Sequence, residues 1–198
     1  MARFDATRRE LVATVLLTGP AGAGKRSLVE AIRNRLPEHR RALESPPPPG
    51  VLSWLPLDLG RIGGWQVRLQ LYVLPERGDG EATRRLLISE ADGLLAVLDS
   101  QASRLDDNLA ALRRMQEAML DREGDLRDMP TVFLYTKQDL PRELILPLEE
   151  LDDALNFRGA ISRSAIIPTG SGVLEALHAI VTLVLRRLAP AAADRPVE

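Results

Sequence analysis

A short apolar run followed by a glycine-rich loop and a helix constrains this chain more than any other feature. Residues 11–18 are apolar and rich in β-branched side chains, which is typical of a buried strand. The next loop, residues 19–25, reads GPAGAGK and matches the pattern G-x-x-x-x-G-K. Beyond it, Leu28, Ile32 and Leu36 recur at helical spacing. A strand, this loop and a helix in this order predict an α/β fold with a phosphate-binding loop.

The chemistry of phosphate binding explains the residue types in this loop. Glycines let successive backbone N–H groups point toward a phosphate, the helix N-terminus adds partial positive charge, and a lysine reaches the terminal phosphates. The chain has 26 basic residues, of which only Lys25 and Lys137 are lysines. A flexible Gly/Ala connector would not need a lysine in such an arginine-rich chain. The predicted phosphate ligands are Gly19, Gly22, Ala23, Gly24, Lys25, Arg26 and Ser27.

The residue after Lys25 departs from the motif. A serine or threonine there ligates Mg²⁺ through its hydroxyl, but this sequence has Arg26, and Ser27 comes one residue late. Because a helix turns by about 100° per residue, Ser27 is expected to point elsewhere. Mg²⁺ binding is therefore predicted to be weak or absent, and no residue is assigned as a metal ligand. Arg26 either stands in for part of the metal's charge or points into solvent.

Strand and helix patterns alternate along the rest of the chain. Extended runs at 51–59 and 67–74 flank several glycines, and strict alternation in the second run predicts an antiparallel hairpin. The order of elements predicts a three-layer α/β fold with a mostly parallel six-stranded sheet, one antiparallel edge hairpin and helices on both faces. Residues 1–188 are expected to form one domain and 189–198 a flexible tail. The other predicted strands are 94–98, 131–135 and 160–167, and the other predicted helices are 81–90, 105–119, 143–156 (interrupted by Pro147) and 173–188.

Composition excludes several classes of protein. The 198 residues include no cysteine, so a disulfide scaffold, a thiolate zinc site and a cysteine nucleophile are excluded. A net charge of −2, with only two Trp, two Tyr and three Phe, disfavours nucleic-acid binding. No apolar run is long enough for a membrane span, and Asp5 and Glu10 do not suit a secretory leader. We therefore expect a cytoplasmic protein.

A second motif follows the predicted strand 131–135. Thr136-Lys137-Gln138-Asp139 resembles the N/T-K-x-D motif of guanine-nucleotide-binding proteins. The Asp139 carboxylate can accept two hydrogen bonds from guanine, at N1 and the exocyclic amine, whereas adenine does not offer this pair. The aliphatic stem of Lys137 can lie on the purine face with its ammonium in water. The alternative is an exposed turn before Pro141. The predicted base-binding residues are Thr136, Lys137 and Asp139, with Ser164 and Ala165 similar to the S-A-x loop that supports guanine.

Together these segments resemble a known family over residues 9–188. The phosphate loop, LPLDLG at 55–60, LYVLP at 71–75 and TKQDLP at 136–141 are similar to the bacterial MglA-type branch of the Ras-like small GTPases. Arf-type GTPases share the KQDLP stretch but match the hairpin less well. The resemblance implies a guanine-nucleotide (GTP/GDP) switch that sets the polarity of motility machinery. It also implies roadblock-type (MglB-like) partners that accelerate hydrolysis.

The chain departs from this family on the catalytic side. The family has Pro-Gly-Gln where this sequence has Pro75-Glu76-Arg77, and Pro49 aligns with its switch threonine. Glu76 adds negative charge near a γ-phosphate, and Arg77, at the position of the glutamine that orients water, cannot polarise water in the same way. No firm catalytic residue is assigned. We expect slow or absent GTP hydrolysis and poor discrimination between GTP and GDP, with the proline-rich loop and the hairpin as an interaction surface.

Three alternatives stay open at this point. A partner could supply the missing groups in trans, or Arg40, Arg41 or Arg77 could supply them from within the chain. The chain could be a protein-interaction module that binds no nucleotide, although its two retained lysines oppose this. An ATP-using kinase is the third alternative, but the sequence contains no recognisable substrate lid and Asp139 favours guanine.

Overall fold

The computed structural model describes residues 2–40, 53–74, 81–120 and 129–193. Its strands are β1 (Arg3–Asp5), β2 (Glu10–Thr18), β3 (Trp54–Ile62), β4 (Trp65–Val73), β5 (Gly93–Asp99), β6 (Thr131–Thr136) and β7 (Ile161–Ser164). Its α-helices are α1 (Lys25–Arg35), α2 (Glu81–Glu90), α3 (Leu105–Leu120), α4 (Leu148–Leu155) and α5 (Val173–Ala193). Two short 3-10 helices are η1 (Glu38–Arg40) and η2 (Ala102–Arg104).

The strands form one mixed sheet in the order β3-β4-β2-β5-β6-β7. Strand β2 runs parallel to both β4 and β5, and the parallel pairing continues through β6 to β7. The fold class is therefore confirmed, with one addition: the sheet has seven strands, because β1 pairs antiparallel with the start of β2. The parallel arrangement brings the carboxyl ends of β2, β5, β6 and β7 to one edge of the sheet, where ligands bind in open α/β folds.

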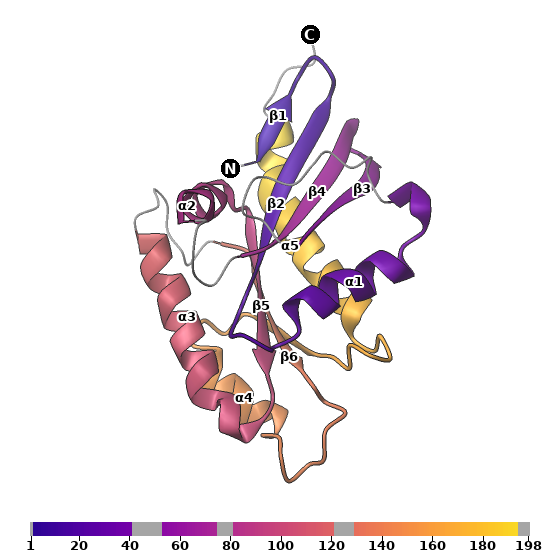
Figure 1. Cartoon of the computed structure of the whole chain (residues 1–198). Coiled ribbons are helices and arrows are strands. Elements are labelled where there is room, and N and C mark those ends of the chain that lie inside the picture. Colours follow the sequence, from indigo (N-terminus) through magenta and orange to yellow (C-terminus); the bar gives the residue numbers. More distant parts are fainter. Residues whose placement is uncertain (1, 41–52, 75–80, 121–128, 194–198) are drawn as a thin grey trace.

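Helices cover both faces of the sheet, as Figure 1 shows. Helices α1 and α5 lie on one face and share a core with β2, β4 and β5, in which Leu28, Ile32 and Ile180 are fully buried. Helices α2, α3 and α4 cover the other face, where Met119 and Leu151 are among the buried side chains. Burial on both faces explains why β5 and β6 are continuous apolar runs instead of alternating ones.

The edge hairpin is formed by β3 and β4. Strand β3 is the outermost strand, so Pro56, which has no N–H, sits where one side of the strand needs no partner. Gly63 and Gly64 join the strands with φ values of +58° and +85°, the left-handed conformation that a tight hairpin turn requires. The register shifts between Asp58 and Gly60, and the Asp58 carboxylate accepts the Gly60 N–H at 2.7 Å.

Three boundaries differ from the sequence prediction. Residues 143–147 are not helical, and α4 begins after Pro147, since a proline is accepted at a helix start but not inside the helix. Strand β7 has only four residues, ending at Ser164. Helix α5 continues to Ala193 with Pro190 inside it. In the described part of the chain, no helix is both long and apolar enough to cross a lipid bilayer.

A partly buried polar contact joins α4 to β6. The Tyr135 hydroxyl donates to the Asp152 carboxylate at 2.9 Å. Burial and this carboxylate raise the pKa of Tyr135 above the ordinary value for tyrosine. Tyr135 therefore stays protonated and joins the middle of α4 to β6.

Several predicted features lie outside the described residues. These are the segment 41–52 with Arg41, its prolines and Pro49, the segment 75–80 with Pro75, Glu76 and Arg77, and the end of the chain from 194 to 198.

Candidate nucleotide-binding site

Positive φ angles shape the phosphate loop. Gly19, Gly22 and Gly24 have φ values of +137°, +79° and +94°, which L side chains rarely adopt. A Cβ on Gly19 would lie 1.9 Å from the carbonyl oxygen of Val97 on β5, so this glycine is also required by close packing. Gly24 is the N-cap of α1, and the loop therefore leads directly into the helix N-terminus. This is the geometry of an anion-binding concavity.

Lys25 is held inside this loop. Its ammonium donates to the carbonyl oxygens of Gly19 and Pro20, both at 2.7 Å, and the residue is only 7% exposed. The compact ammonium with its three donors can serve both neighbouring carbonyls at once. These two bonds hold the Lys25 ammonium against the backbone of the phosphate loop.

The base loop follows β6 at the same sheet edge. The Thr136 hydroxyl is fully buried and lies 2.9 Å from the carbonyl oxygens of Ala23 and Leu98. Lys137 adopts a left-handed backbone with φ +63°, and its ammonium contacts the Asp99 carboxylate at 2.5 Å and the Gln101 side chain at 3.0 Å. The base loop is therefore joined both to the phosphate loop and to the end of β5.

The loop after β7 supports the base loop from the other side. The Ala165 N–H donates to the Tyr135 carbonyl at 2.8 Å, and the Gln138 N–H reaches the Ala165 carbonyl at 3.5 Å. A Cβ on Gly172, whose φ is +76°, would lie 1.9 Å from the Ser164 carbonyl oxygen. Ala165 is buried, whereas Ser164 is exposed.

One open cavity of about 690 Å³ connects the two motifs. Gly22, Ala23, Gly24, Arg26 and Ser27 border its phosphate-loop side, and Lys137 and Asp139 border its base-loop side. Its remaining walls are Glu30, Ala31, Asn34 and Arg35 of α1 with Leu140, Ile167 and Pro168. Among the predicted site residues, Gly19, Lys25, Thr136, Ser164 and Ala165 do not border this cavity and belong to the framework around it.

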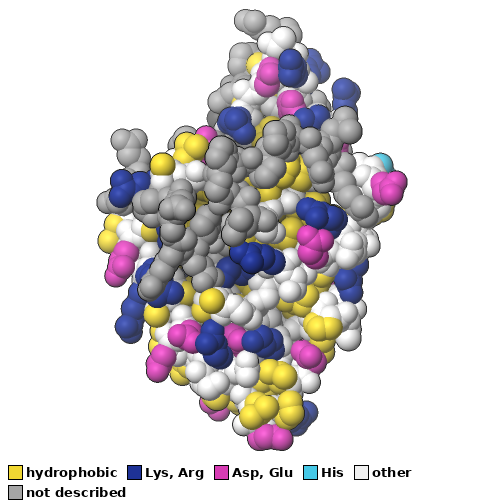
Figure 2. Space-filling model, viewed as in Figure 1, with side chains coloured by type: hydrophobic (Ala, Val, Ile, Leu, Met, Phe, Trp, Pro, Cys, Tyr) yellow, Lys and Arg dark blue, Asp and Glu magenta, His cyan; other side chains and the backbone are white. Residues whose placement is uncertain are grey.

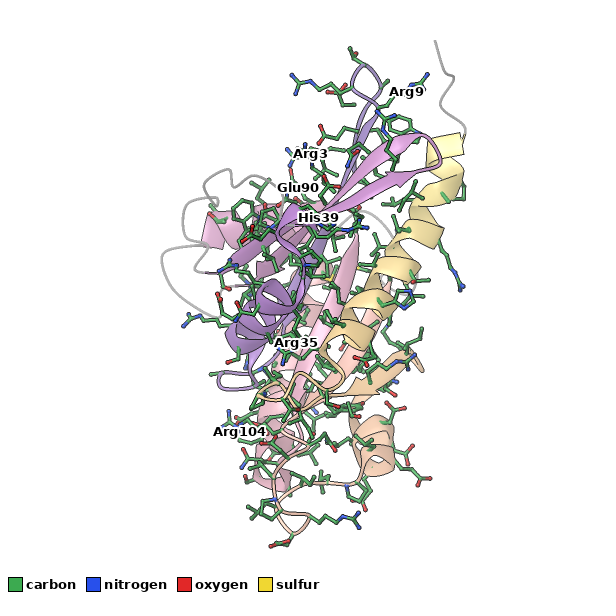
Figure 3. All side chains as sticks on the ribbon, turned by 90° about the vertical axis from the view of Figure 1, so that its right-hand side faces the viewer. Arg3, Arg9, Arg35, His39, Glu90 and Arg104 are labelled. Carbon is green, nitrogen blue, oxygen red and sulfur yellow. The ribbon has the colours of Figure 1, made fainter. Side chains whose placement is uncertain are left out.

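The sequence did not reveal the acidic and basic residues that surround Lys137. Asp99 ends β5 with no exposed surface, and Arg104 of η2 lies 3.9 Å from its carboxylate. Arg104, labelled in Figure 3, also donates to the Ala21 carbonyl of the phosphate loop and pairs with Asp107, both at 2.7 Å. The one available signal was an acidic residue that ends a wholly apolar strand at the ligand-binding edge of a parallel sheet.

The residues fit a nucleoside phosphate better than they fit Mg²⁺. Glycine N–H groups, the start of α1 and the Lys25 ammonium are the groups that bind a phosphate. The only hydroxyl on the described cavity wall is that of Ser27, beside the cationic Arg26, and a guanidinium cannot ligate a metal. Among the described residues, no cluster of three His, Cys, Asp or Glu side chains is arranged to hold a metal ion.

Phosphate and base motifs that share one cavity at the carboxyl edge of a mostly parallel sheet define a class of protein, the P-loop GTPases with a Ras-like fold. No family profile matches the chain. The chain is 31% identical over 193 residues to the mutual gliding-motility protein MglA of Myxococcus xanthus (strain DK1622). The matched region covers 95% of this chain and 98% of that protein. The chain therefore belongs to the MglA-type small GTPases, and this membership implies guanine-nucleotide binding.

Proposed function

We propose that this protein is a cytoplasmic guanine-nucleotide switch or scaffold that binds GDP and GTP but, alone, hydrolyses GTP slowly or not at all. The observation that carries the proposal is the position of Arg26. It borders the cavity directly after Lys25, where a hydroxyl would ligate Mg²⁺. A positive charge there attracts phosphate without activating water, and it repels a divalent cation.

The sequence of the two segments that lie outside the described residues supports the same proposal. Pro49 has neither a hydroxyl nor an N–H for a metal or a γ-phosphate. In the sequence, Glu76 takes the position of the family's glycine next to the γ-phosphate, where a carboxylate is expected to repel it, and Arg77 takes that of the glutamine that orients the attacking water. Because these contacts to the metal and the γ-phosphate are missing, the γ-phosphate adds little to the binding free energy. GTP and GDP are therefore expected to bind with similar affinity.

The cellular role is proposed from the family. The Myxococcus relative is named for gliding motility, and we extend to this chain a role in cell polarity or motility with a roadblock-type (MglB-like) partner. Basic and acidic side chains are interspersed on the face shown in Figure 2, and the net charge of the chain is −2. This charge pattern favours a protein partner over nucleic acid.

Nucleotide binding and hydrolysis can be measured separately. Fluorescent GDP and GTP are titrated with and without EDTA, and GTP hydrolysis is followed in a single turnover. Tight binding of both nucleotides that changes little with EDTA, together with slow hydrolysis, is the expected result. Rapid Mg²⁺-dependent turnover would contradict the proposal. Denaturing the purified protein and identifying the released molecule by chromatography tests the alternative of a module without nucleotide.

A second candidate is an active GTPase completed by a partner in trans. The position of Arg40 argues that a catalytic arginine would come from a partner and not from this residue. The Arg40 guanidinium lies 3.4 Å from the Asp58 carbonyl on the hairpin and does not border the cavity. An arginine supplied by a partner typically accelerates hydrolysis by several orders of magnitude. Adding a co-expressed roadblock-type protein to the hydrolysis assay separates the two candidates.

A further inference from the structure

Arg35, the last residue of α1, reaches the loop that leads from β7 to α5. Its guanidinium atoms fill the space beside Gly170, where an added Cβ would lie 1.9 to 2.1 Å from Nε, Cζ and Nη2. Its Nη1 group also donates to the Ala31 carbonyl at 3.2 Å. Figure 3 shows Arg35 between α1 and this loop. Two contacts on different elements therefore hold the guanidinium plane at the cavity wall.

Arg35 borders the cavity together with the loop that follows β7, because Gly170, which it contacts, donates its N–H to the carbonyl of Ile167 on the same wall. Lys137, Asp139, Ile167 and Pro168 border the same space, and no aromatic side chain is among its described lining residues. A purine has two large faces that bind well to flat or apolar groups. The Lys137 stem offers contact for one face, because its ammonium is held away by Asp99.

Distance and charge separate Arg35 from the phosphate end. The backbone of Arg35 lies about 15 Å along α1 from Lys25, since the helix rises about 1.5 Å per residue over ten residues. The other cation and anion on this part of the helix, Arg33 and Glu30, pair with each other at 2.9 Å. In the described part of the chain, no carboxylate pairs with Arg35 and the residue is exposed, so no ion pair competes for its guanidinium group.

We propose that the Arg35 guanidinium stacks on the guanine base and supplies the flat surface that an aromatic side chain provides in other nucleotide sites. The proposal rests on guanine-nucleotide binding as proposed above, and it assigns Arg35 to the base instead of the phosphates. Guanidinium groups stack readily on aromatic rings, whereas a lysine ammonium in the same place has no plane to offer.

The test compares R35A, R35K and R35F with the control R186A, which removes an exposed cation from α5 that does not border the cavity. Affinities for GDP, GTP and inorganic pyrophosphate are measured by calorimetry and competition. R35A and R35K are expected to lower the affinities for GDP and GTP by the same factor. That factor is roughly tenfold, as for the loss of one base-stacking partner. R35F is expected to restore most of the affinity and R186A to leave it unchanged, and pyrophosphate binding is expected to be unchanged throughout.

Other outcomes overturn the proposal in distinguishable ways. R35A could lose more affinity for GTP than for GDP and also lose affinity for pyrophosphate, while R35K keeps the wild-type affinities. That result would assign Arg35 to the phosphates. Unchanged affinity in R35A would remove Arg35 from the site. Thermal unfolding of each variant without nucleotide identifies a purely structural effect through Gly170, because the melting temperature would then fall while the affinity of the folded protein is preserved. If the wild-type protein binds pyrophosphate but no guanine nucleotide, the proposed function itself fails.

Discussion

The hydroxyl of Thr136 lies 2.9 Å from the carbonyl oxygen of Ala23, so a residue of the base loop touches the phosphate loop directly. The same hydroxyl lies 2.9 Å from the Leu98 carbonyl at the end of β5, and it can donate to either oxygen. Ala23 and Thr136 are 113 positions apart in the sequence. One buried hydroxyl therefore holds together two loops that a nucleotide must contact at the same time.

Replacing Thr136 by valine is expected to loosen both loops. The T136V variant keeps the shape of the side chain but removes the buried donor, which costs about 1–3 kcal/mol when a buried polar group loses its partner. Both the free energy of unfolding, measured in urea, and the affinity for GDP are expected to fall. T136S keeps the hydroxyl and serves as the control, so equal behaviour of the two variants would contradict this role of the hydroxyl.

The sequence was informative wherever a local pattern carried the chemistry. The glycine loop and Asp139 lie at one edge of the sheet, as the order of strand, loop and helix in the sequence indicates, because such a motif fixes its own geometry. Asp99 and Arg35 were missed because their partners, Lys137 and Gly170, come from distant segments. Strand β1 was missed because the turn before β2 has no glycine, and Arg9 itself adopts a φ of +49°.

The ion pair between Asp99 and Lys137 is expected to be strongly coupled. Asp99 is completely buried, so D99N leaves the lysine without its anionic partner at 2.5 Å. We expect D99N to destabilise the fold by about 1–3 kcal/mol, less than for a fully buried pair because Lys137 is partly exposed. K137M, which keeps the stem, and the double variant complete a cycle of urea unfolding measurements. Additive effects of the two substitutions would show that the pair contributes no coupling energy.

Asp139 is expected to select the base. The D139N variant replaces two acceptors by one acceptor and one donor, which cannot satisfy both guanine donors but does complement xanthine, where a carbonyl replaces the exocyclic amine. Affinity for GDP is expected to fall by roughly two orders of magnitude, as two charge-assisted hydrogen bonds are disturbed. Affinity for xanthosine diphosphate is expected to rise. Both are measured by competition against a fluorescent nucleotide, and a parallel loss for both bases would argue against base selection by this residue.

Two glycines of the phosphate loop are expected to differ sharply in their tolerance of a methyl group. In G19A the new Cβ would meet the Val97 backbone oxygen at 1.9 Å, and backbone on β5 cannot move away without disturbing the sheet. In G22A the new Cβ would meet no atom of the described residues within 4 Å, apart from its neighbours in the chain, so the expected penalty is that of the left-handed backbone at φ +79°, about 1–2 kcal/mol. Urea unfolding without nucleotide is the measurement. Comparable stability of the two variants would show that the close approach to β5 is not what requires Gly19.

Replacing Arg26 is expected to restore a dependence on Mg²⁺. In R26S a hydroxyl directly follows Lys25, at the position from which the motif ligates the metal. GDP release from R26S is expected to speed up at least roughly tenfold when EDTA is added, the range seen when metal binding in a site is disturbed, whereas release from the wild-type protein changes little. S27A is the matched control, since Ser27 also borders the cavity and is the other hydroxyl that a metal could use. If EDTA already accelerates release from the wild-type protein and S27A abolishes that effect, Ser27 holds the metal in place of the missing ligand, and Arg26 does not exclude it.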